Sequence, residues 1–277
     1  MLDVSTSYTE DLDLLRSAAV AAGIIAAGYF RQDVKSWKKE NATPVSEVDI
    51  LVDRYLAATL LSARPDYGWL SEETVDNPSR LTCRRVFVVD PIDGTSGFLR
   101  GEDSWTICLA VVEDGVPVAG VVYAPVRDEL YDAVAGGTGR LNGQPLRRSR
   151  RAGTLPLIPA PGAVHQQMQK AGLNYTRGPV YSSLAYRLVQ VATGRLDGLA
   201  VRRGSQDWDI AAAALILAAS GVEFADVCSG TPRFNKRDVR HGALAALSDM
   251  SLKPVVHAAL IDVYGCPETS DADLAIS

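Results

Sequence analysis

The sequence predicts an α+β fold, and three patterns along the chain support this prediction. Near the N-terminus, two stretches carry apolar residues at spacings of three and four, the period of a helix that buries one face. Apolar strand-like runs joined by turn sequences fill the middle of the chain. Helical stretches then alternate with short strands. With 277 residues, 47% of them hydrophobic and 22% charged, the chain has an ordinary composition for one large or two small globular domains.

The first helix is predicted over residues 9–31. Thr9 can cap it, and the acidic residues that follow suit the positive N-terminal end of the helix dipole. Residues 32–48 are polar and are expected to form a loop. A second helix is predicted over residues 49–63, and Pro65 after it prevents the helix from continuing.

The strands come next. Residues 85–89 form a continuous apolar run, which is typical of a buried strand. Two further strands, over 105–112 and 116–123, are joined by a hairpin signal at Asp114-Gly115, and a fourth covers 130–135. Asn142-Gly143 predicts a second tight turn.

A domain boundary is predicted within residues 147–162, which contain four arginines followed by three prolines. It divides an N-terminal α+β domain, 1–150, from a C-terminal α/β domain, 151–277. In an acidic chain the arginines are more simply explained as a solvated hinge than as a nucleic-acid patch. Beyond the boundary we expect helices over 183–193 and 208–220, strands over 198–201, 222–225 and 243–248, then a possible helix and an acidic tail.

Charge and cysteine content limit the class of protein. A net charge of -5 argues against a general nucleic-acid binder, which needs an excess of basic residues. The first 13 residues carry acidic side chains and no Lys or Arg, unlike a signal peptide, and the apolar stretch after them is too short to span a membrane. The four cysteines are widely spread, so free thiols in a reducing compartment are expected. These features predict a cytoplasmic protein.

The chemistry centres on the hexapeptide Asp90-Pro-Ile-Asp-Gly-Thr95. An apolar strand ends at Asp90, and Asp93 follows three residues later, so both carboxylates can point into one space with the Ile92 carbonyl between them. Carboxylates held this close repel each other unless a cation lies between them. Oxygen ligands favour Mg²⁺ over Zn²⁺. Gly94 permits an unusual backbone conformation, and Thr95 begins a turn whose N–H groups can face an anion.

Other acidic residues have simpler structural explanations when each is taken alone. Glu72 and Glu73 could belong to a solvated loop, and Asp49 and Asp209 could cap helices. Their joint occurrence with the hexapeptide is much harder to explain by chance.

Four motifs in this order resemble the inositol monophosphatase superfamily, a group of Mg²⁺-dependent, lithium-sensitive phosphatases. They are Thr43-Pro-Val-Ser-x-x-Asp49, Glu72-Glu73, Asp90 to Thr95, and Trp208-Asp209-x-Ala-Ala212, and the resemblance covers residues 8–248. It implies a layered αβαβα sandwich, with an antiparallel sheet and most metal ligands in the N-terminal domain, Asp209 supplied by the C-terminal domain, and the active site between the two. It also implies a homodimer and a small phosphorylated metabolite as substrate, without nucleic-acid or membrane partners.

The resemblance also implies a role for each motif residue. Glu72, Asp90 and the Ile92 carbonyl would hold one Mg²⁺, and Asp90, Asp93 and Asp209 a second. Glu73 would support a third ion or its waters. Thr95, polarised by Asp49, would orient the attacking water. The backbone N–H groups of Gly94 and Thr95 would bind the phosphate oxygens. The rest of the substrate would be contacted by Ser96, Arg202 and Arg203.

The identity of the phosphate ester stays open at this stage. Gly120 to Pro125 and Ser182-Ser-Leu184 resemble 3′(2′),5′-bisphosphate nucleotidases, whereas Gly194-Arg-Leu-Asp-Gly198 resembles inositol phosphatases. Inositol enzymes usually carry a Glu near the position of Arg202 and Arg203. Arginine is a poor acceptor for hydroxyl protons but a good partner for a second phosphate. The sequence therefore slightly favours adenosine 3′,5′-bisphosphate over inositol 1-phosphate as substrate. A catalytically silent binding or regulatory protein of the same fold is the remote alternative.

Overall fold

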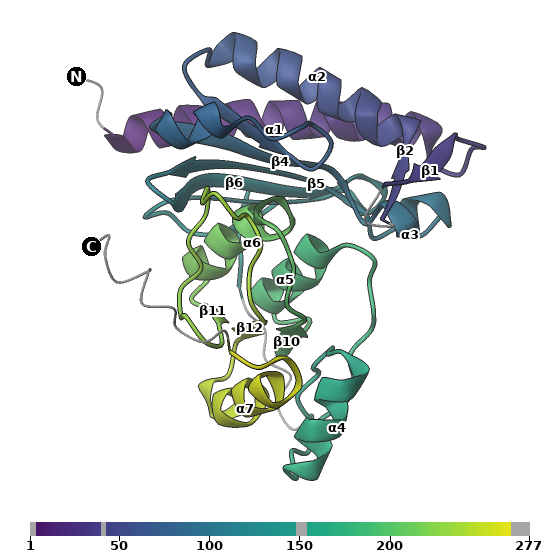
Figure 1. The fold of residues 1–277 in the computed structure, drawn as a ribbon, viewed down its shortest axis with the longest axis vertical. Coiled ribbons are helices and arrows are strands. Elements are labelled where there is room, and N and C mark those ends of the chain that lie inside the picture. Colours follow the sequence, from purple (N-terminus) through teal and green to yellow (C-terminus); the bar gives the residue numbers. More distant parts are fainter. Residues whose placement is uncertain (1–3, 40–42, 148–153, 267–277) are drawn as a thin grey trace.

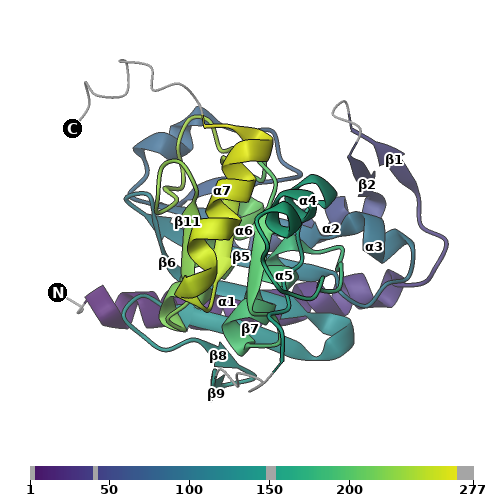
Figure 2. The same cartoon turned by 90° about the horizontal axis from the view of Figure 1, so that it is seen from below.

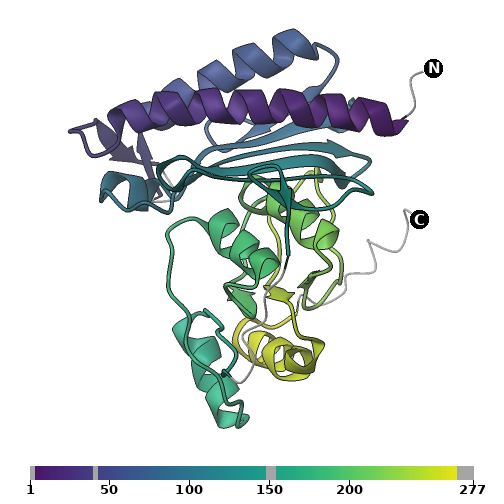
Figure 3. The same cartoon turned by 180° about the vertical axis from the view of Figure 1, so that it is seen from behind.

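The computed structural model describes residues 4–39, 43–147 and 154–266, and within them the chain forms the expected layered sandwich (Figure 1). From one end to the other, the layers are two long helices, a large sheet, two helices, a small sheet and two final helices. Figure 3 shows the same order from behind. The predicted αβαβα architecture is confirmed.

The outer helical layer consists of α1 (Val4–Tyr29) and α2 (Glu47–Ala63). Helix α1 begins before Thr9, so Thr9 does not cap it and that prediction was wrong. The expected loop between the helices contains a short antiparallel hairpin of β1 (Ser36–Lys38) and β2 (Pro44–Ser46). Its strands are too short to give an alternating pattern in the sequence.

A seven-stranded sheet lies beneath these helices, with its strands in chain order from β3 to β9. Neighbouring strands are antiparallel except β3 and β4, which are parallel, so the expectation of a purely antiparallel sheet is corrected at this edge. Both predicted turns form: Asp114 and Gly115 join β5 to β6, and Asn142 and Gly143 join β8 to β9, all four with positive φ. The strands are β3 (Gly68–Ser71), β4 (Arg85–Asp93), β5 (Thr106–Glu113), β6 (Val116–Ala124), β7 (Glu129–Val134), β8 (Arg140–Leu141) and β9 (Gln144–Pro145).

The other face of the sheet is covered by α5 (Leu184–Thr193) and α6 (Asp207–Ala219). Below them lies a three-stranded antiparallel sheet in the order β10-β12-β11, and α4 and α7 close the molecule, as Figure 2 shows from that side. The sequence did not predict α4. The remaining elements are β10 (Gly198–Val201), β11 (Glu223–Asp226), β12 (Leu244–Leu247), α3 (Thr95–Leu99), α4 (Gly162–Lys170), α7 (Lys253–Tyr264) and the short 3₁₀ turns Pro78–Thr82, Pro125–Arg127 and Met250–Leu252.

Three apolar cores fill the spaces between the layers. Strand β5 separates two of them, because Ile107 and Leu109 face α1 and α2 whereas Cys108 and Ala110 face α5 and α6. This alternation follows from the two-residue period of a strand. The large sheet is therefore buried on both faces, which explains why its central strands read as continuous apolar runs.

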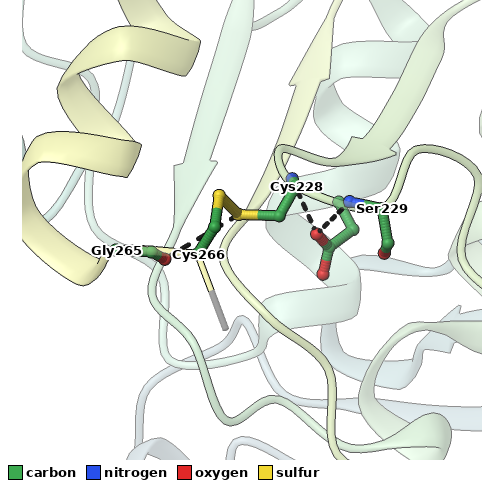
Figure 4. Close-up of a disulfide and its surroundings, with 5 residues drawn as sticks. Cys228, Ser229, Gly265 and Cys266 are labelled. Atoms are coloured by element: carbon green, nitrogen blue, oxygen red, sulfur yellow. Dashed lines mark hydrogen bonds between the residues drawn. A yellow bond between two sulfur atoms is a disulfide. The ribbon is translucent and has the colours of Figure 1, made fainter. Parts of the chain in front are cut away.

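The cysteine prediction was wrong for one pair. Cys228, after β11, and Cys266, after α7, form a disulfide that closes a separation of 38 residues (Figure 4). Both residues are exposed. Cys83 and Cys108 are free thiols, as expected. Because exposed disulfides are typical of oxidising surroundings, the cysteines no longer support a cytoplasmic location.

The stretch Ser7–Tyr29 of α1 is long and apolar enough to cross a membrane, but core helices pass the same test. This helix packs its Leu12 and Leu15 face onto the sheet.

Two predicted segments cannot be compared with the structure. Three of the arginines at the predicted domain boundary, and the acidic tail, lie outside the described residues.

Candidate active site

Asp90 and Asp93 meet at the end of β4, where the strand becomes irregular. The β4–β5 pairing shifts register between these two residues, and such a bulge redirects side chains. Asp90 Oδ1 accepts the Ile92 N–H at 3.0 Å, which fixes the turn. Carboxylate oxygens of Asp90, Asp93 and Asp209 all lie within 4.8 Å of one another. The structure thus brings together residues that are more than a hundred positions apart in the chain.

Helix α5 positions Asp93 from the opposite side. The Asp93 carboxylate accepts hydrogen bonds from the Ser183 hydroxyl at 2.6 Å and from the Leu184 and Ala185 N–H groups at 3.2 and 2.7 Å. Ser183 is the N-cap of α5, and the first N–H groups of a helix have no partner inside it. The C-terminal half therefore orients a ligand that belongs to the N-terminal half.

Asp209 lies in the first turn of α6, as predicted. Its Oδ2 accepts the Gln206 N–H at 2.6 Å, which fixes the side chain at the start of the helix. Burial, followed by the charge of Asp93, raises the pKa of Asp209 to about 8. Burial and the charge of Glu72 raise the pKa of Asp90 well above its usual range. These carboxylates ionise with difficulty unless a cation accompanies them.

Glu72 and Glu73 follow β3 and share a cation that the sequence did not predict. Lys39 Nζ, on the β1–β2 hairpin, lies 3.0 Å from Glu72 Oε1 and 2.8 Å from Glu73 Oε1. Burial would lower the pKa of Lys39, but the two carboxylates raise it overall. Burial raises the pKa of Glu73 to about 7. An ammonium already occupies the space between two of the expected metal-site carboxylates, so the region favours positive charge.

Thr95 and Asp49 form the predicted pair. Thr95 Oγ1 lies 2.7 Å from Asp49 Oδ1 and 3.0 Å from the Ile92 carbonyl oxygen. Ser46 holds the other Asp49 oxygen through its N–H at 2.8 Å and its hydroxyl at 2.5 Å. Ser46, rather than Asp49, is the N-cap of α2. Burial raises the pKa of Asp49 despite these donors.

Gly94 makes the close approach between the two halves possible. Its φ is +94°, in the left-handed region, and a Cβ there would lie 2.9 Å from the Ser183 nitrogen. Gly94 is also the N-cap of α3, so the N–H groups of Thr95 and Ser96 have no partner inside this short helix.

A cavity of about 480 Å³ opens beside Glu72 and Asp209. Arg202 lines it, whereas Arg203 is exposed and is not among the lining residues. Arg187, on α5, also lines it and was missed by sequence reasoning. The other lining residues are Thr43, Pro159, Ala160, Pro161, Val180, Leu184, Ala200, Val201, Gly204, Ser205, Gln206 and Trp208.

The donor set fits Mg²⁺. The clustered side chains are carboxylates, and no His or Cys joins them among the residues that the structure describes. Hard oxygen ligands suit a hard divalent ion. Burial is the largest cause of the raised pKa values of Asp90, Asp93 and Asp209, and neighbouring carboxylates add to it for Asp90 and Asp209. A divalent cation relieves both effects.

One family of known proteins is similar to this chain. A family profile described as the inositol monophosphatase family matches residues 8–262. The chain belongs to the inositol monophosphatase family. It is 32% identical to an inositol-1-monophosphatase of Rhizobium meliloti over 76% of this chain and 83% of that protein. It is 28% identical to the 3′(2′),5′-bisphosphate nucleotidase CysQ of Aggregatibacter actinomycetemcomitans, over 76% and 82%.

A solved structure shows the same fold. The extragenic suppressor protein suhB of Bartonella henselae matches with a TM-score of 0.77 and 26% identity, over 91% of this chain and 98% of that one. Membership of the family establishes a phosphoric monoester hydrolase of the metal-dependent type that acts on a small phosphorylated metabolite.

Three residues of the site escaped the sequence analysis: Lys39, Ser183 and Arg187. Lys39 was assigned to a loop. Ser183 was noted only as the start of a helix and as part of the Ser182-Ser-Leu184 motif, although a serine in that place can donate to an anion as well as cap. Arg187 lies one turn further along α5, on the side that faces the cavity.

Proposed function

We propose that the enzyme hydrolyses its phosphomonoester by direct attack of water, with two or three Mg²⁺ ions held by Glu72, Asp90, the Ile92 carbonyl, Asp93 and Asp209. The observation that carries the proposal is the convergence of the Asp90, Asp93 and Asp209 carboxylates within 4.8 Å. Bound Mg²⁺ would neutralise these groups, polarise the phosphoryl oxygens and stabilise the attacking and leaving oxygens.

The chain's own residues orient the water. Thr95 donates its hydroxyl proton to Asp49, 2.7 Å away, so its lone pairs are free to accept a proton from the attacking water. Ser46 fixes Asp49 and so fixes the direction of the Thr95 hydroxyl. Glu73, next to the metal ligands, supports a further ion or its waters. The N–H groups of Gly94 and Thr95 bind phosphate oxygens.

For the substrate we propose a 3′(2′),5′-bisphosphate nucleotide, with adenosine 3′,5′-bisphosphate as the test compound. Arg202 supports it, because this arginine lines the cavity in the region where an inositol enzyme would carry a Glu. Among the residues that line the cavity, the carboxylates are Glu72 and Asp209, both assigned to metal. None is left to accept sugar hydroxyl protons. Inositol 1-phosphate is the second candidate, favoured by the similarity to an inositol-1-monophosphatase.

The first experiment measures phosphate release with Mg²⁺ from both compounds side by side. Higher turnover of the nucleotide supports the proposal, and higher turnover of inositol 1-phosphate refutes the substrate assignment. Asp93→Asn should abolish release while the protein stays folded, because an amide oxygen still accepts from the α5 N-terminus. Retained turnover in this variant would refute the metal assignment. No release from any phosphomonoester would favour a silent binding protein.

We further propose that the enzyme is a homodimer. Exposed apolar side chains of Tyr29, Trp37 and Leu51 border one hollow on the outer helical layer and offer a surface for association. Light scattering on the purified protein tests the dimer, and a monomeric mass at micromolar concentration would refute it.

A further inference from the structure

Arg187 has an unusual environment for a largely buried arginine. Its Nε donates to the Ser183 carbonyl at 3.2 Å, but within the described residues its guanidinium makes no ion pair with a carboxylate. Buried arginines are normally paired. Arg187 lines the active-site cavity, where its remaining N–H groups can meet a bound molecule.

Arg202 adds a second positive charge to the same wall. It follows β10, is exposed, and makes no hydrogen bond with the residues that the structure describes. Burial, and to a smaller extent the charge of Arg202, lower the pKa of Arg187, although the charges of Asp93 and Asp209 raise it. Two guanidinium groups that face one cavity repel each other unless an anion lies between them.

Ser205 provides an independent sign of a ligand. The residue is only 8% exposed, it lines the cavity, and its buried Oγ has no hydrogen-bond partner within the described chain. A buried hydroxyl without a partner costs about 1–3 kcal/mol, so such a group is normally satisfied by a ligand or by water. Ser205 stands in the loop between Arg202 and α6, on the same wall.

We infer that Arg187, Arg202 and Ser205 form a subsite for a second phosphate group of the substrate, next to the phosphate that is hydrolysed. Guanidinium forks and a hydroxyl match the acceptor oxygens of a phosphate. The inference rests on the proposed function, because it takes Asp90, Asp93 and Asp209 as the place of the scissile phosphate. It extends that proposal by making Arg187 a specificity-determining residue and by making the second phosphate, rather than the base, the group that is recognised.

Two matched pairs of substrates test the subsite: adenosine 3′,5′-bisphosphate against adenosine 3′-phosphate, and inositol 1,4-bisphosphate against inositol 1-phosphate. Within each pair the compounds differ only in the second phosphate. We expect the bisphosphate to have a kcat/KM about 100-fold higher in at least one pair, equivalent to about 2.7 kcal/mol. Equal kcat/KM values within both pairs would overturn the inference.

Variants identify the residues. Arg187→Gln and Arg202→Gln should each lower kcat/KM for the preferred bisphosphate by about 10- to 100-fold through KM, and Ser205→Ala by about 5-fold. The matching monophosphate should be affected far less. Arg237→Gln is the matched control, because Arg237 is exposed and does not line the cavity. Melting temperatures confirm that each variant is folded.

A second readout separates substrate recognition from support of the metal site. If Arg187 only balances the charge of Asp93 and Asp209, Arg187→Gln will change the Mg²⁺ concentration for half-maximal rate and will affect both members of a pair equally. That result would overturn the inference. Calorimetric titration with adenosine 5′-phosphate and with inositol 4-phosphate tests the subsite without catalysis. Binding of either that weakens in Arg187→Gln would support the subsite even if no phosphate is released, whereas binding that this variant leaves unchanged would count against it.

Discussion

Asp209→Asn should stabilise the metal-free protein while it abolishes activity. Asp209 is crowded against other acidic groups, and burial together with Asp93 raises its pKa to about 8 from an ordinary value of 3.8. Between about pH 4 and pH 8 the folded protein therefore binds a proton that the unfolded chain releases. The free energy of unfolding of the metal-free protein falls as the pH rises through this window. Asparagine imitates the protonated form and keeps the acceptor for the Gln206 N–H.

The pKa difference sets the magnitude of this effect. At about 1.36 kcal/mol for each pH unit, the upper limit at pH 8 is about 5 kcal/mol. Neighbouring carboxylates share the proton, and buffer cations screen the cluster, so we expect about 2 kcal/mol. For a protein of this size, that gain raises the melting temperature by about 4–8 °C.

Thermal unfolding with EDTA at pH 8 and at pH 5 is the assay. The advantage of Asp209→Asn should vanish at pH 5, where wild-type Asp209 is already protonated. Adding Mg²⁺ should stabilise the wild type much more than the variant. Asp207→Asn is the control: Asp207 lies two residues away and accepts from His241 and the Asn235 N–H, so its loss should destabilise the protein with or without Mg²⁺. A melting temperature for Asp209→Asn at or below that of the wild type at pH 8 would refute the reasoning.

Three other predictions concern the site and the disulfide. Thr95→Ala should lower kcat by about 100-fold or more with little change in KM, and Thr95→Ser should retain most of the rate, because only the hydroxyl orients water. Lys39→Gln should lower the Mg²⁺ concentration for half-maximal activity, since its ammonium competes for Glu72; a higher requirement would contradict this. Cys228→Ser should lower stability by about 3–4 kcal/mol in denaturant titrations while kcat stays unchanged, and loss of activity in the folded variant would refute it.

The carboxylates of the proposed metal site could be singled out because each is marked by local sequence. Asp90 ends an apolar run, Asp93 follows the turn at Pro91, and Asp209 lies in the first turn of a helix. Each carboxylate therefore stands at the boundary of an element that the sequence predicts. The order of the layers came from the resemblance to the inositol monophosphatase superfamily and not from these patterns. The start of α1 was predicted wrongly, because Thr9 is a good cap residue and yet the helix continues on its N-terminal side.

The partners of these ligands could not be predicted, because they come from contacts between distant segments. Ser183 contacts Asp93 across 90 positions, and the sequence around Ser183 shows a helix start and a family motif but no sign of this contact. Arg187 continues that helix with no signal that its side faces a cavity rather than solvent. Cys228 and Cys266 pair across 38 positions without a close cysteine motif, so composition alone pointed to free thiols.

The charges of the two cavity walls explain why a substrate with two phosphates would suit this site. Glu72, Asp90, Asp93 and Asp209 carry four negative charges when ionised, which two Mg²⁺ ions would balance. Lys39 separately offsets Glu73. A metal-loaded wall is then close to neutral, and the positive charge of the cavity comes from Arg187 and Arg202. A neutral tail would leave these two positive charges in the cavity without a counter-charge, whereas a second phosphate supplies it. In this arrangement the carboxylates and their ions serve the reaction, and the arginines select the substrate.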